Sequence, residues 1–264
     1  MAKSISIVTA SLNHAPFIDD TIRSVLDQRY PNLEYIVIDG GSTDGTLERI
    51  QKYSSSISHF VSEKDSGHAS ALNKGFHHAT GEIMGWINSD DKYLPWTFRT
   101  VSDIFEQFPE INWIVGTNSW LNDKGAMIGA INTYNNIFDY LSGKFFGIQQ
   151  ESVFWRRPLW ESAGGFINEK YKFMVDAELW TRFFLLDNLW HANCVFAGYR
   201  MHQGNRATRF RDECVNEVSL AIKAMHRNAD SNKLSRMERN YFSLNYDLQT
   251  GMWTKQIVPR QPNP

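Results

Sequence analysis

The first ninety residues alternate between short apolar runs and helical patterns, and this alternation constrains the fold more than any other feature of the chain. Four runs rich in apolar or β-branched side chains form the predicted strands: residues 4–9, 33–38, 59–62 and 83–87. Between the first two runs, Ile18, Ile22, Val25 and Leu26 recur at the spacing of an amphipathic helix. Strands that alternate with helices predict right-handed βαβ units and a mainly parallel sheet. We therefore expect an α/β fold in which helices flank the sheet.

The alternation ends after residue 117. A hairpin is expected where Trp120-Leu121 and Met127-Ile128 flank the turn at 122–125. Residues 132–160 are rich in aromatic side chains and glycine, which suit a second binding surface, although core packing explains most such aromatics. The remaining patterns predict a helix from Asp176, a strand at 194–197, a long helix at 211–228 and a second helix over about 234–246.

Bulk composition excludes several classes of protein. The 264 residues carry a formal net charge of -2, which argues against a nucleic-acid partner because such proteins present a basic face. Two cysteines, Cys194 and Cys214, give neither a disulfide framework nor a zinc site. The N-terminus shows no signal-peptide pattern, and no apolar run reaches the roughly 18 to 20 residues of a membrane span. We expect a soluble cytoplasmic protein, with peripheral contact at the inner face of the membrane left open.

A polar stretch follows the predicted strand at 83–87. Asn88, Ser89, Asp90 and Asp91 stand where an open α/β sheet binds its ligands, just beyond the carboxyl end of a strand. Two adjacent carboxylates repel each other, so a site that keeps both ionised usually supplies a cation. Oxygen ligands favour Mg²⁺ or Mn²⁺, which often bridge to substrate phosphates. The alternative is that one of these residues caps a helix near Pro95.

Two other predicted strands also end at polar residues. The first strand leads to Thr9, Ser11 and Asn13, and the second ends at Asp39. Carboxylates, amides and hydroxyls could bind the base and ribose of a nucleotide, although each of these residues is also an ordinary turn former. The chain contains neither Gly-x-Gly-x-x-Gly nor the Walker lysine motif, so phosphate charge would have to be met by a cation.

Taken together, several stretches resemble glycosyltransferase family 2. The resemblance covers about the first 210 residues and is specific as a set. It rests on Ser-Ile-Val-Thr-Ala-Ser-Leu-Asn (6–13), the stretches 22–28 and 30–46, Ala-Leu-Asn-Lys-Gly (71–75), 80–83, Trp-Ile-Asn-Ser-Asp-Asp (86–91), Glu-Ser-Val-Phe-Trp-Arg-Arg (151–157), 164–166, Asp-Ala-Glu-Leu-Trp (176–180) and Tyr-Arg-Met-His (199–202).

The resemblance implies a GT-A fold, a nucleotide-sugar donor, a divalent cation (Mn²⁺ or Mg²⁺) and inversion at the anomeric carbon. Asp39 would contact the nucleotide, and Asp90 and Asp91 would stand in for the family's Asp-x-Asp motif. Asp91 is preferred as the metal ligand, and Asp90 could bind the metal or the ribose. Asn88 replaces the first acid of the motif, and its amide could still bind a ribose hydroxyl. Gly40 replaces a second acid often found after Asp39, which leaves the base of the donor open.

Other positions acquire roles from the same resemblance. Asp176 matches the catalytic base that removes the proton of the acceptor hydroxyl, although it could also cap its helix. His202 resembles a histidine that binds the metal or diphosphate, and Arg200 could hold phosphate. The remaining assignments are His68, Lys74 and Ser89 near the donor, and Gln150, Trp155 and, as the fallback base, Glu178 on the acceptor side.

The predicted domain organisation follows the same comparison. Residues 1–208 would form the GT-A domain, with a nucleotide-sugar half at 1–117 and an acceptor and catalytic-base half at 118–208. Residues 209–264 would form a C-terminal helical extension. Its long helix could pair with a second copy or touch a membrane, but bracing the sheet is the favoured interpretation.

The predicted function is an inverting glycosyltransferase that acts on a glycan or lipid-linked acceptor in surface polysaccharide or oligosaccharide synthesis. One alternative is a sugar-phosphate nucleotidyltransferase, which should show a glycine-rich basic loop after the first strand. The corresponding segment here is Ala10-Ser11-Leu12-Asn13-His14, which is neither glycine-rich nor basic. Another alternative is a non-catalytic nucleotide-sugar-binding module, which would lose the base or the metal ligands.

Overall fold

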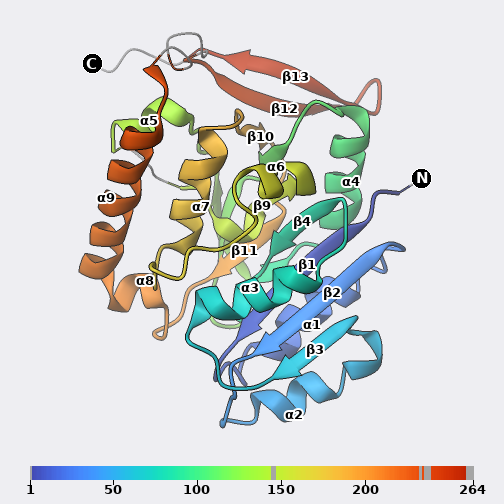
Figure 1. The fold of residues 1–264 in the computed structure, drawn as a ribbon. Coiled ribbons are helices and arrows are strands. Elements are labelled where there is room, and N and C mark those ends of the chain that lie inside the picture. Colours follow the sequence, from blue (N-terminus) through green and yellow to red (C-terminus); the bar gives the residue numbers. More distant parts are fainter. Residues whose placement is uncertain (1, 144–146, 232–233, 235–238, 260–264) are drawn as a thin grey trace.

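A computed structural model describes residues 2–143, 147–231, 234 and 239–259 (Figure 1). Its main feature is a nine-stranded sheet in the order β13-β12-β10-β6-β9-β4-β1-β2-β3. The strands are β1 (Ile5–Ser11), β2 (Leu33–Asp39), β3 (His59–Ser62), β4 (Ile83–Trp86), β6 (Trp113–Val115), β9 (Val153–Arg156), β10 (Trp190–Ala192), β12 (Tyr241–Asp247) and β13 (Met252–Val258). Strands β3, β2, β1 and β4 are parallel neighbours, as are β6, β10 and β12. The expected mainly parallel α/β sheet is confirmed.

A smaller sheet of four strands lies beside the large one, in the order β5-β11-β7-β8. Its strands are β5 (Lys92–Tyr93), β7 (Asn118–Leu121), β8 (Met127–Ile131) and β11 (Ala197–Arg200). The hairpin predicted around residues 122–125 is the β7–β8 pair. The strand predicted at 194–197 falls almost entirely in a connection. Strand β10 ends at Ala192, and β11 begins at Ala197.

Helices cover both faces of the large sheet. They are α1 (Ile18–Leu26), α2 (Thr46–Gln51), α3 (His68–His78), α4 (Thr97–Gln107), α5 (Ile137–Leu141), α6 (Arg157–Ser162), α7 (Val175–Phe184), α8 (Arg206–Arg209) and α9 (Arg211–Asn228), with short 3₁₀ turns η1 (Ser54–Ser56) and η2 (Gln150–Ser152). Successive residues of a strand point to opposite faces, so Ile7 joins the core under α1 and α4 whereas Val8 joins the core under α3 and α7.

The segment after α9 differs from the prediction. A helix was expected over about 234–246, but Tyr241–Asp247 is strand β12, and residues 235–238 lie outside the described part of the chain. The reason is tertiary: Phe242 and Leu244 alternate with polar residues, and β12 pairs in parallel with β10. Figure 1 shows the β12–β13 hairpin extending the sheet beyond β10. Trp253 and Leu244 enter the same core as α4, so the β12–β13 hairpin is part of the packed sheet.

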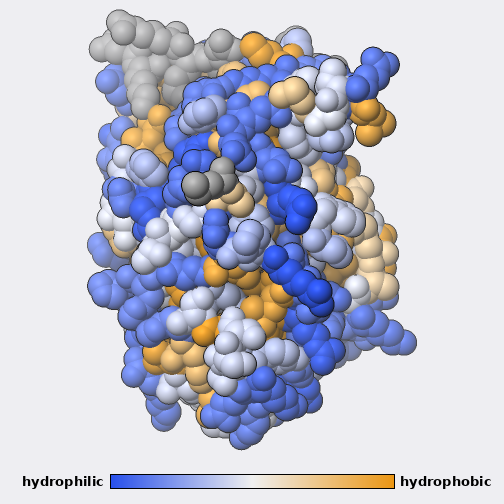
Figure 2. Space-filling view, turned by 90° about the vertical axis from the view of Figure 1, so that its right-hand side faces the viewer, coloured by the Kyte–Doolittle hydropathy of each residue, from blue (hydrophilic) through white to orange (hydrophobic). Residues whose placement is uncertain are grey.

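In the view of Figure 2, hydrophilic residues lie between the apolar patches of the surface. Across the described residues, none of the helices combines the length and apolar composition that a membrane span requires.

The contact between α3 and β1 gives a stability prediction. A Cβ at Gly75 would overlap Cγ1 of the buried Val8, so Gly75→Ala should lower the free energy of unfolding by about 1–3 kcal/mol despite the better helix propensity of alanine. Gly129→Ala is the matched control, because the nearest atom, in Trp120, lies 3.8 Å from its Cβ position. Urea unfolding of both variants measures the difference. Equal stability of the two would contradict the packing described for α3.

Candidate active site

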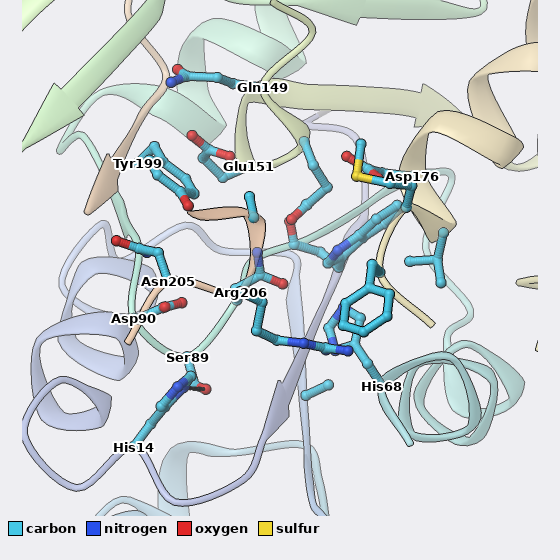
Figure 3. A pocket seen from close by; sticks show the side chains of 18 of the residues that line it. His14, His68, Ser89, Asp90, Gln149, Glu151, Asp176, Tyr199, Asn205 and Arg206 are labelled. Carbon is cyan, nitrogen blue, oxygen red and sulfur yellow. Dashed lines mark hydrogen bonds between the residues drawn. The ribbon is translucent and has the colours of Figure 1, made fainter. Parts of the chain in front are cut away.

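A cleft of about 700 Å³ opens at the carboxyl ends of β1 and β4. One wall comes from these strand ends, and the other comes from η2, the start of α7, β11 and the segment that enters α8 (Figure 3). Ser11, Asn88, Ser89 and Asp90 lie on the first wall, as the sequence predicted for the polar residues that follow the strands. A ligand-binding position beyond the carboxyl ends of parallel strands is typical of open α/β sheets.

Asp90 is the carboxylate of this stretch that faces the cleft. Its Oδ2 lies 2.9 Å from Nε2 of His202, which approaches from the loop after β11. Burial acts to raise the pKa of Asp90, but the hydrogen bond from His202 and the charges of His14 and His202 outweigh it and lower the pKa. The sequence prediction that Asp90 and His202 come together is thus met by the geometry. The neighbouring Asp91 does not line the cleft.

Asp91 is fully buried and does not line the cleft. Its Oδ1 accepts a hydrogen bond from the backbone N–H of Arg200 at 2.8 Å, and its Oδ2 accepts one from Nδ2 of Asn88 at 3.3 Å. Burial, followed by the charges of Asp90 and Glu151, raises the pKa of Asp91 well above its usual value. The structure therefore does not support the preference for Asp91 as the metal ligand, because Asp91 turns away from the cleft to hold β11.

Arg200 is also committed to the interior, with a side chain only 2% exposed. Its guanidinium donates to the backbone carbonyls of Asp90 at 2.7 Å and Asp123 at 3.0 Å, and pairs with Asp20 at 3.1 Å. These bonds use three of the five N–H donors of the side chain, and Arg200 does not line the cleft. The suggestion that Arg200 holds phosphate is wrong, since the residue braces the loop that carries Asp90.

The pair of Asp90 and His202 fits a divalent cation. Two neighbouring ligands of an octahedral Mg²⁺ or Mn²⁺, each about 2.1 Å from the ion, lie about 3 Å apart. The 2.9 Å between Oδ2 of Asp90 and Nε2 of His202 matches that spacing. Within the described residues, no group of three or more histidine, cysteine, aspartate or glutamate side chains could hold a metal by itself. A cation at this pair would need further ligands from water or a bound phosphate.

Asp176 lies on the opposite wall, in the first turn of α7 (Figure 3). Burial raises its pKa to about 6, against the lowering effect of the backbone N–H groups of Ala177 and Asp176 itself, and the charge of Glu217 adds to the rise. The helix begins after Met174, whose side chain makes no cap, so Asp176 is not the N-cap that the alternative interpretation proposed. A carboxylate with a pKa near neutrality is suited to accept a proton.

The loop before α7 is capped by a side chain of another helix, α9. Glu217, on α9, accepts hydrogen bonds from the backbone N–H groups of Lys172, Phe173 and Met174 at 2.8, 2.9 and 2.9 Å. These donors come directly before the first turn of α7, which carries Asp176. The long helix α9 thus fixes the start of α7, whereas the prediction was that it braces the sheet.

Glu178, the predicted fallback for Asp176, points elsewhere. Two residues further along a helix a side chain is rotated by about 200°, which turns Glu178 away from the cleft. It forms an ion pair with Arg182 at 2.8 Å and is buried. The structure therefore does not bring Glu178 to the acceptor side, and Asp176 is the carboxylate that α7 presents to the cleft.

Trp155 is also absent from the cleft wall. It has no exposed surface and packs in the core, with ring centroids 5.6 Å from Trp86 and 5.9 Å from Trp180. The predicted acceptor contact at Trp155 is wrong because β9 lies between β6 and β4 with both faces covered, Phe154 in one core and Trp155 in the other. Gln150, the other residue assigned to the acceptor, does line the cleft.

Four predicted donor-binding residues lie outside the cleft. Thr9 is buried and accepts from the hydroxyl of Tyr35 at 3.1 Å, while Asn13 accepts from the backbone N–H of Thr43. Both oxygens of Asp39 accept hydrogen bonds within its own turn or from Ser62. Lys74 forms an ion pair with Glu63 at 2.7 Å. These four residues make contacts within the protein and do not line the cleft.

His68 lies in the cleft as predicted, and it has a neighbour that the sequence did not suggest. Burial, followed by the charge of Arg206, lowers the pKa of His68 to about 4, so its imidazole is neutral at pH 7. Arg206 lines the same cleft from the start of α8 and donates to the backbone carbonyl of Lys172.

Sequence reasoning also missed Glu151, His14, Asn118 and Tyr199, all of which line the cleft. Glu151 stands in one of the stretches that carry the family resemblance, but the pattern gave it no role. Nδ1 of His14 lies 2.5 Å from Oγ of Ser89, on the wall that holds Asp90. Burial, followed by the charges of Asp176 and Asp90, raises the pKa of Glu151 to about 8.

The fold is similar to those of solved glycosyltransferase structures. S. aureus TarS 1-349 in complex with UDP-GlcNAc matches it with a TM-score of 0.70, at 16% identity over 88% of this chain and 69% of that one. A mannosyltransferase from Pyrobaculum calidifontis, in complex with GDP-Man and Mn²⁺, gives a TM-score of 0.64 at 19% identity over 88% and 66%. At such identities the likeness shows the fold alone, which is that of GT-A glycosyltransferases.

A family model described as glycosyl transferase family 2 matches residues 6–190. The chain belongs to this family, as the sequence resemblance indicated. A Bacillus subtilis protein named for teichuronic acid biosynthesis is 40% identical over 92 residues, which cover 34% of this chain and 36% of that protein. A glycosyltransferase of Rickettsia typhi is 23% identical over 280 residues, covering 96% of this chain and 86% of that protein. The matched stretches span about a third of the length of the first curated relatives.

The cap on α7 gives a second stability prediction. Glu217→Ala should lower the free energy of unfolding by about 1–2 kcal/mol, because three backbone N–H groups lose their acceptor. Glu213→Ala, one turn earlier on the exposed side of α9, should change it by less than about 0.5 kcal/mol. Urea unfolding compares the two variants. If both were neutral, Glu217 would not hold the start of α7.

Proposed function

We propose that this glycosyltransferase moves a sugar from a nucleoside-diphosphate sugar to a hydroxyl group of an acceptor, with inversion at the anomeric carbon. The observation that carries the proposal is the placing of Asp90, paired with His202, and Asp176 on opposite walls of one cleft. The first pair suits the diphosphate side of the donor, and the second carboxylate suits the attacking hydroxyl. A single displacement between the two walls inverts the configuration.

Asp90 and His202 would hold a divalent cation, Mn²⁺ or Mg²⁺, which when bound supplies positive charge to the leaving diphosphate. Arg206 adds a permanent positive charge on the facing segment. His68 lies nearby in its neutral form, so it can donate or accept a hydrogen bond without adding charge. These side chains support a phosphate-binding end of the cleft.

Asp176 would act as the general base. The acceptor oxygen bonds to the anomeric carbon, its proton passes to a carboxylate oxygen of Asp176, and the bond from that carbon to the diphosphate oxygen breaks. A pKa of about 6 leaves Asp176 mostly ionised at pH 7 while keeping it basic enough to take the proton. Its distance from the cation pair across the cleft avoids a strong lowering of that pKa.

The acceptor we propose is a growing glycan or a lipid-linked sugar. The relative named for teichuronic acid biosynthesis supports a polysaccharide product. Such an acceptor would place the enzyme at the inner face of the membrane during its reaction.

The roles of the two carboxylates can be separated by mutation. Asp90→Asn should remove most of the Mn²⁺-dependent affinity for a nucleoside diphosphate, whereas Asp176→Asn should keep that affinity and lower the transfer rate by about 10²–10⁴-fold. Calorimetry with UDP and GDP in the presence and absence of Mn²⁺ measures binding. Mass spectrometry of released nucleoside diphosphate measures turnover. Pyrophosphate release from a nucleoside triphosphate would instead identify a nucleotidyltransferase and overturn the proposal.

The pH dependence of transfer follows from Asp176. A base must be deprotonated, so kcat should fall about tenfold per pH unit below the pKa of about 6 and be nearly constant from there to pH 7.5. Glu217→Gln removes a negative charge that raises this pKa, so the falling limb should move to lower pH. A rate independent of pH between 4.5 and 7.5 would exclude Asp176 as the base.

A further inference from the structure

Several polar atoms of the residues that form the floor and walls of the cleft have no hydrogen-bond partner in the described part of the chain. They are buried, and each belongs to a residue that lines the cleft: Oγ of Ser11, Nε1 of Trp86, Oδ1 of Asn88, Oδ1 of Asn118, Oε1 of Gln150 and Oε1 of Glu151. Buried polar groups in folded proteins are nearly always hydrogen-bonded. Six such atoms belong to residues from both walls of one cleft, and a bound molecule or its water would supply their partners.

The orientation of two of these amides is fixed by their neighbours. Nε2 of Gln150 donates to the backbone carbonyl of Trp86 at 2.5 Å, and Nδ2 of Asn118 donates to the backbone carbonyl of Gly147 at 2.5 Å. A carbonyl oxygen can only accept, so neither amide can exchange its nitrogen and oxygen without losing this bond. Both side chains therefore use their NH₂ group on the protein and leave their oxygen unpaired.

The same holds for Asn88, whose Nδ2 donates to the carboxyl of Asp91 and whose Oδ1 is unpaired. The floor thus presents three amide oxygens that accept hydrogen bonds and an indole N–H that donates. Such a surface repels phosphate, which also carries acceptor oxygens, and suits a molecule with several O–H groups. A pyranose ring has this chemistry.

Glu151 locates the ring within the cleft. Its carboxyl is influenced by the charges of both Asp176 and Asp90, which lie at the acceptor and diphosphate ends of the proposed reaction. In Figure 3 it stands beside Tyr199, and Asp176 lies further along the cleft. The anomeric carbon must lie between the attacking hydroxyl and the leaving diphosphate, so a residue that lines the same cleft as Asp90 and Asp176 is placed to face the sugar that is transferred. A carboxyl that is protonated at pH 7 can also donate a hydrogen bond to a sugar oxygen.

We propose that Asn118, Gln150 and Glu151 form the subsite that binds the hydroxyl groups of the transferred sugar. This proposal rests on the proposed function and assigns Gln150 to the donor sugar, whereas the sequence had suggested the acceptor. It also gives Glu151 and Asn118, which no pattern had marked, a role in selecting which sugar is transferred.

The test compares a nucleotide with and without its sugar. The affinities of UDP, UDP-GlcNAc, GDP and GDP-Man are measured by calorimetry with Mn²⁺, and the pair that wild-type protein binds is then used for the variants. Glu151→Met and Gln150→Met should weaken binding of the nucleotide sugar by about 5- to 150-fold, because buried partners are left unpaired. Binding of the corresponding nucleoside diphosphate should change by less than about twofold.

Ser152→Ala is the matched control. Ser152 is the next residue of the chain and has a buried, unpaired hydroxyl, but it does not line the cleft. This variant should leave both affinities unchanged. Glu151→Met is close to glutamate in size and leaves the bond from Gln150 to Trp86 in place, so it keeps the test valid if Gln150→Met unfolds.

The outcomes separate a failure of the sugar subsite from a failure of the proposed function. If wild-type protein binds the nucleoside diphosphates but both variants keep the wild-type ratio of affinities, the sugar subsite is refuted and the proposed function stands. Equal losses for the nucleotide and the nucleotide sugar would also refute the subsite. If wild-type protein binds none of the four probes, the proposed function fails and the subsite fails with it.

Discussion

The hydrogen bond from the backbone N–H of Arg200 to the buried carboxyl of Asp91 is the contact on which the site depends. It joins the turn after β4 to the end of β11, two segments more than a hundred residues apart in sequence. The guanidinium of Arg200 strengthens the same junction by donating to the backbone carbonyl of Asp90. Because Asp91 is turned inward, Asp90 is turned outward, and the loop after β11 brings His202 beside it. One carboxylate of the pair is structural so that the other can face the cleft.

The opposite wall depends on a part of the chain that lies beyond the family match. Helix α9 follows residue 190, the last residue of that match, yet its Glu217 caps the segment that leads into Asp176. Three of the carboxyl groups that line the cleft lie in different environments. The pKa of Asp90 is lowered, that of Asp176 is raised to about 6 and that of Glu151 is raised to about 8. Different protonation of neighbouring carboxyls is how one site combines cation binding, proton acceptance and hydrogen-bond donation.

Much of this architecture was predictable from local patterns. The first four strands, the β7–β8 hairpin and the long helix at 211–228 follow from residue periodicity, and Ser11, His68, Asp90, Gln150 and Asp176 reach the cleft as expected. The choice between Asp90 and Asp91 was not predictable, since it depends on the distant backbone of Arg200. The strand at Tyr241–Asp247 was missed because its pairing partner, β10, decides its conformation. Glu151 and Arg206 were missed because irregular segments bring them in without a repeating pattern.

The most direct test of the account is the position of the cation. Crystals grown with Mn²⁺ and a nucleoside diphosphate would locate the ion from its anomalous scattering. The account predicts a single strong peak within about 2.5 Å of a carboxylate oxygen of Asp90 and of Nε2 of His202, with Asp91 still bonded to the backbone of Arg200. An ion bound to Asp91, or a nucleotide bound away from the cleft between Asp90 and Asp176, would contradict it.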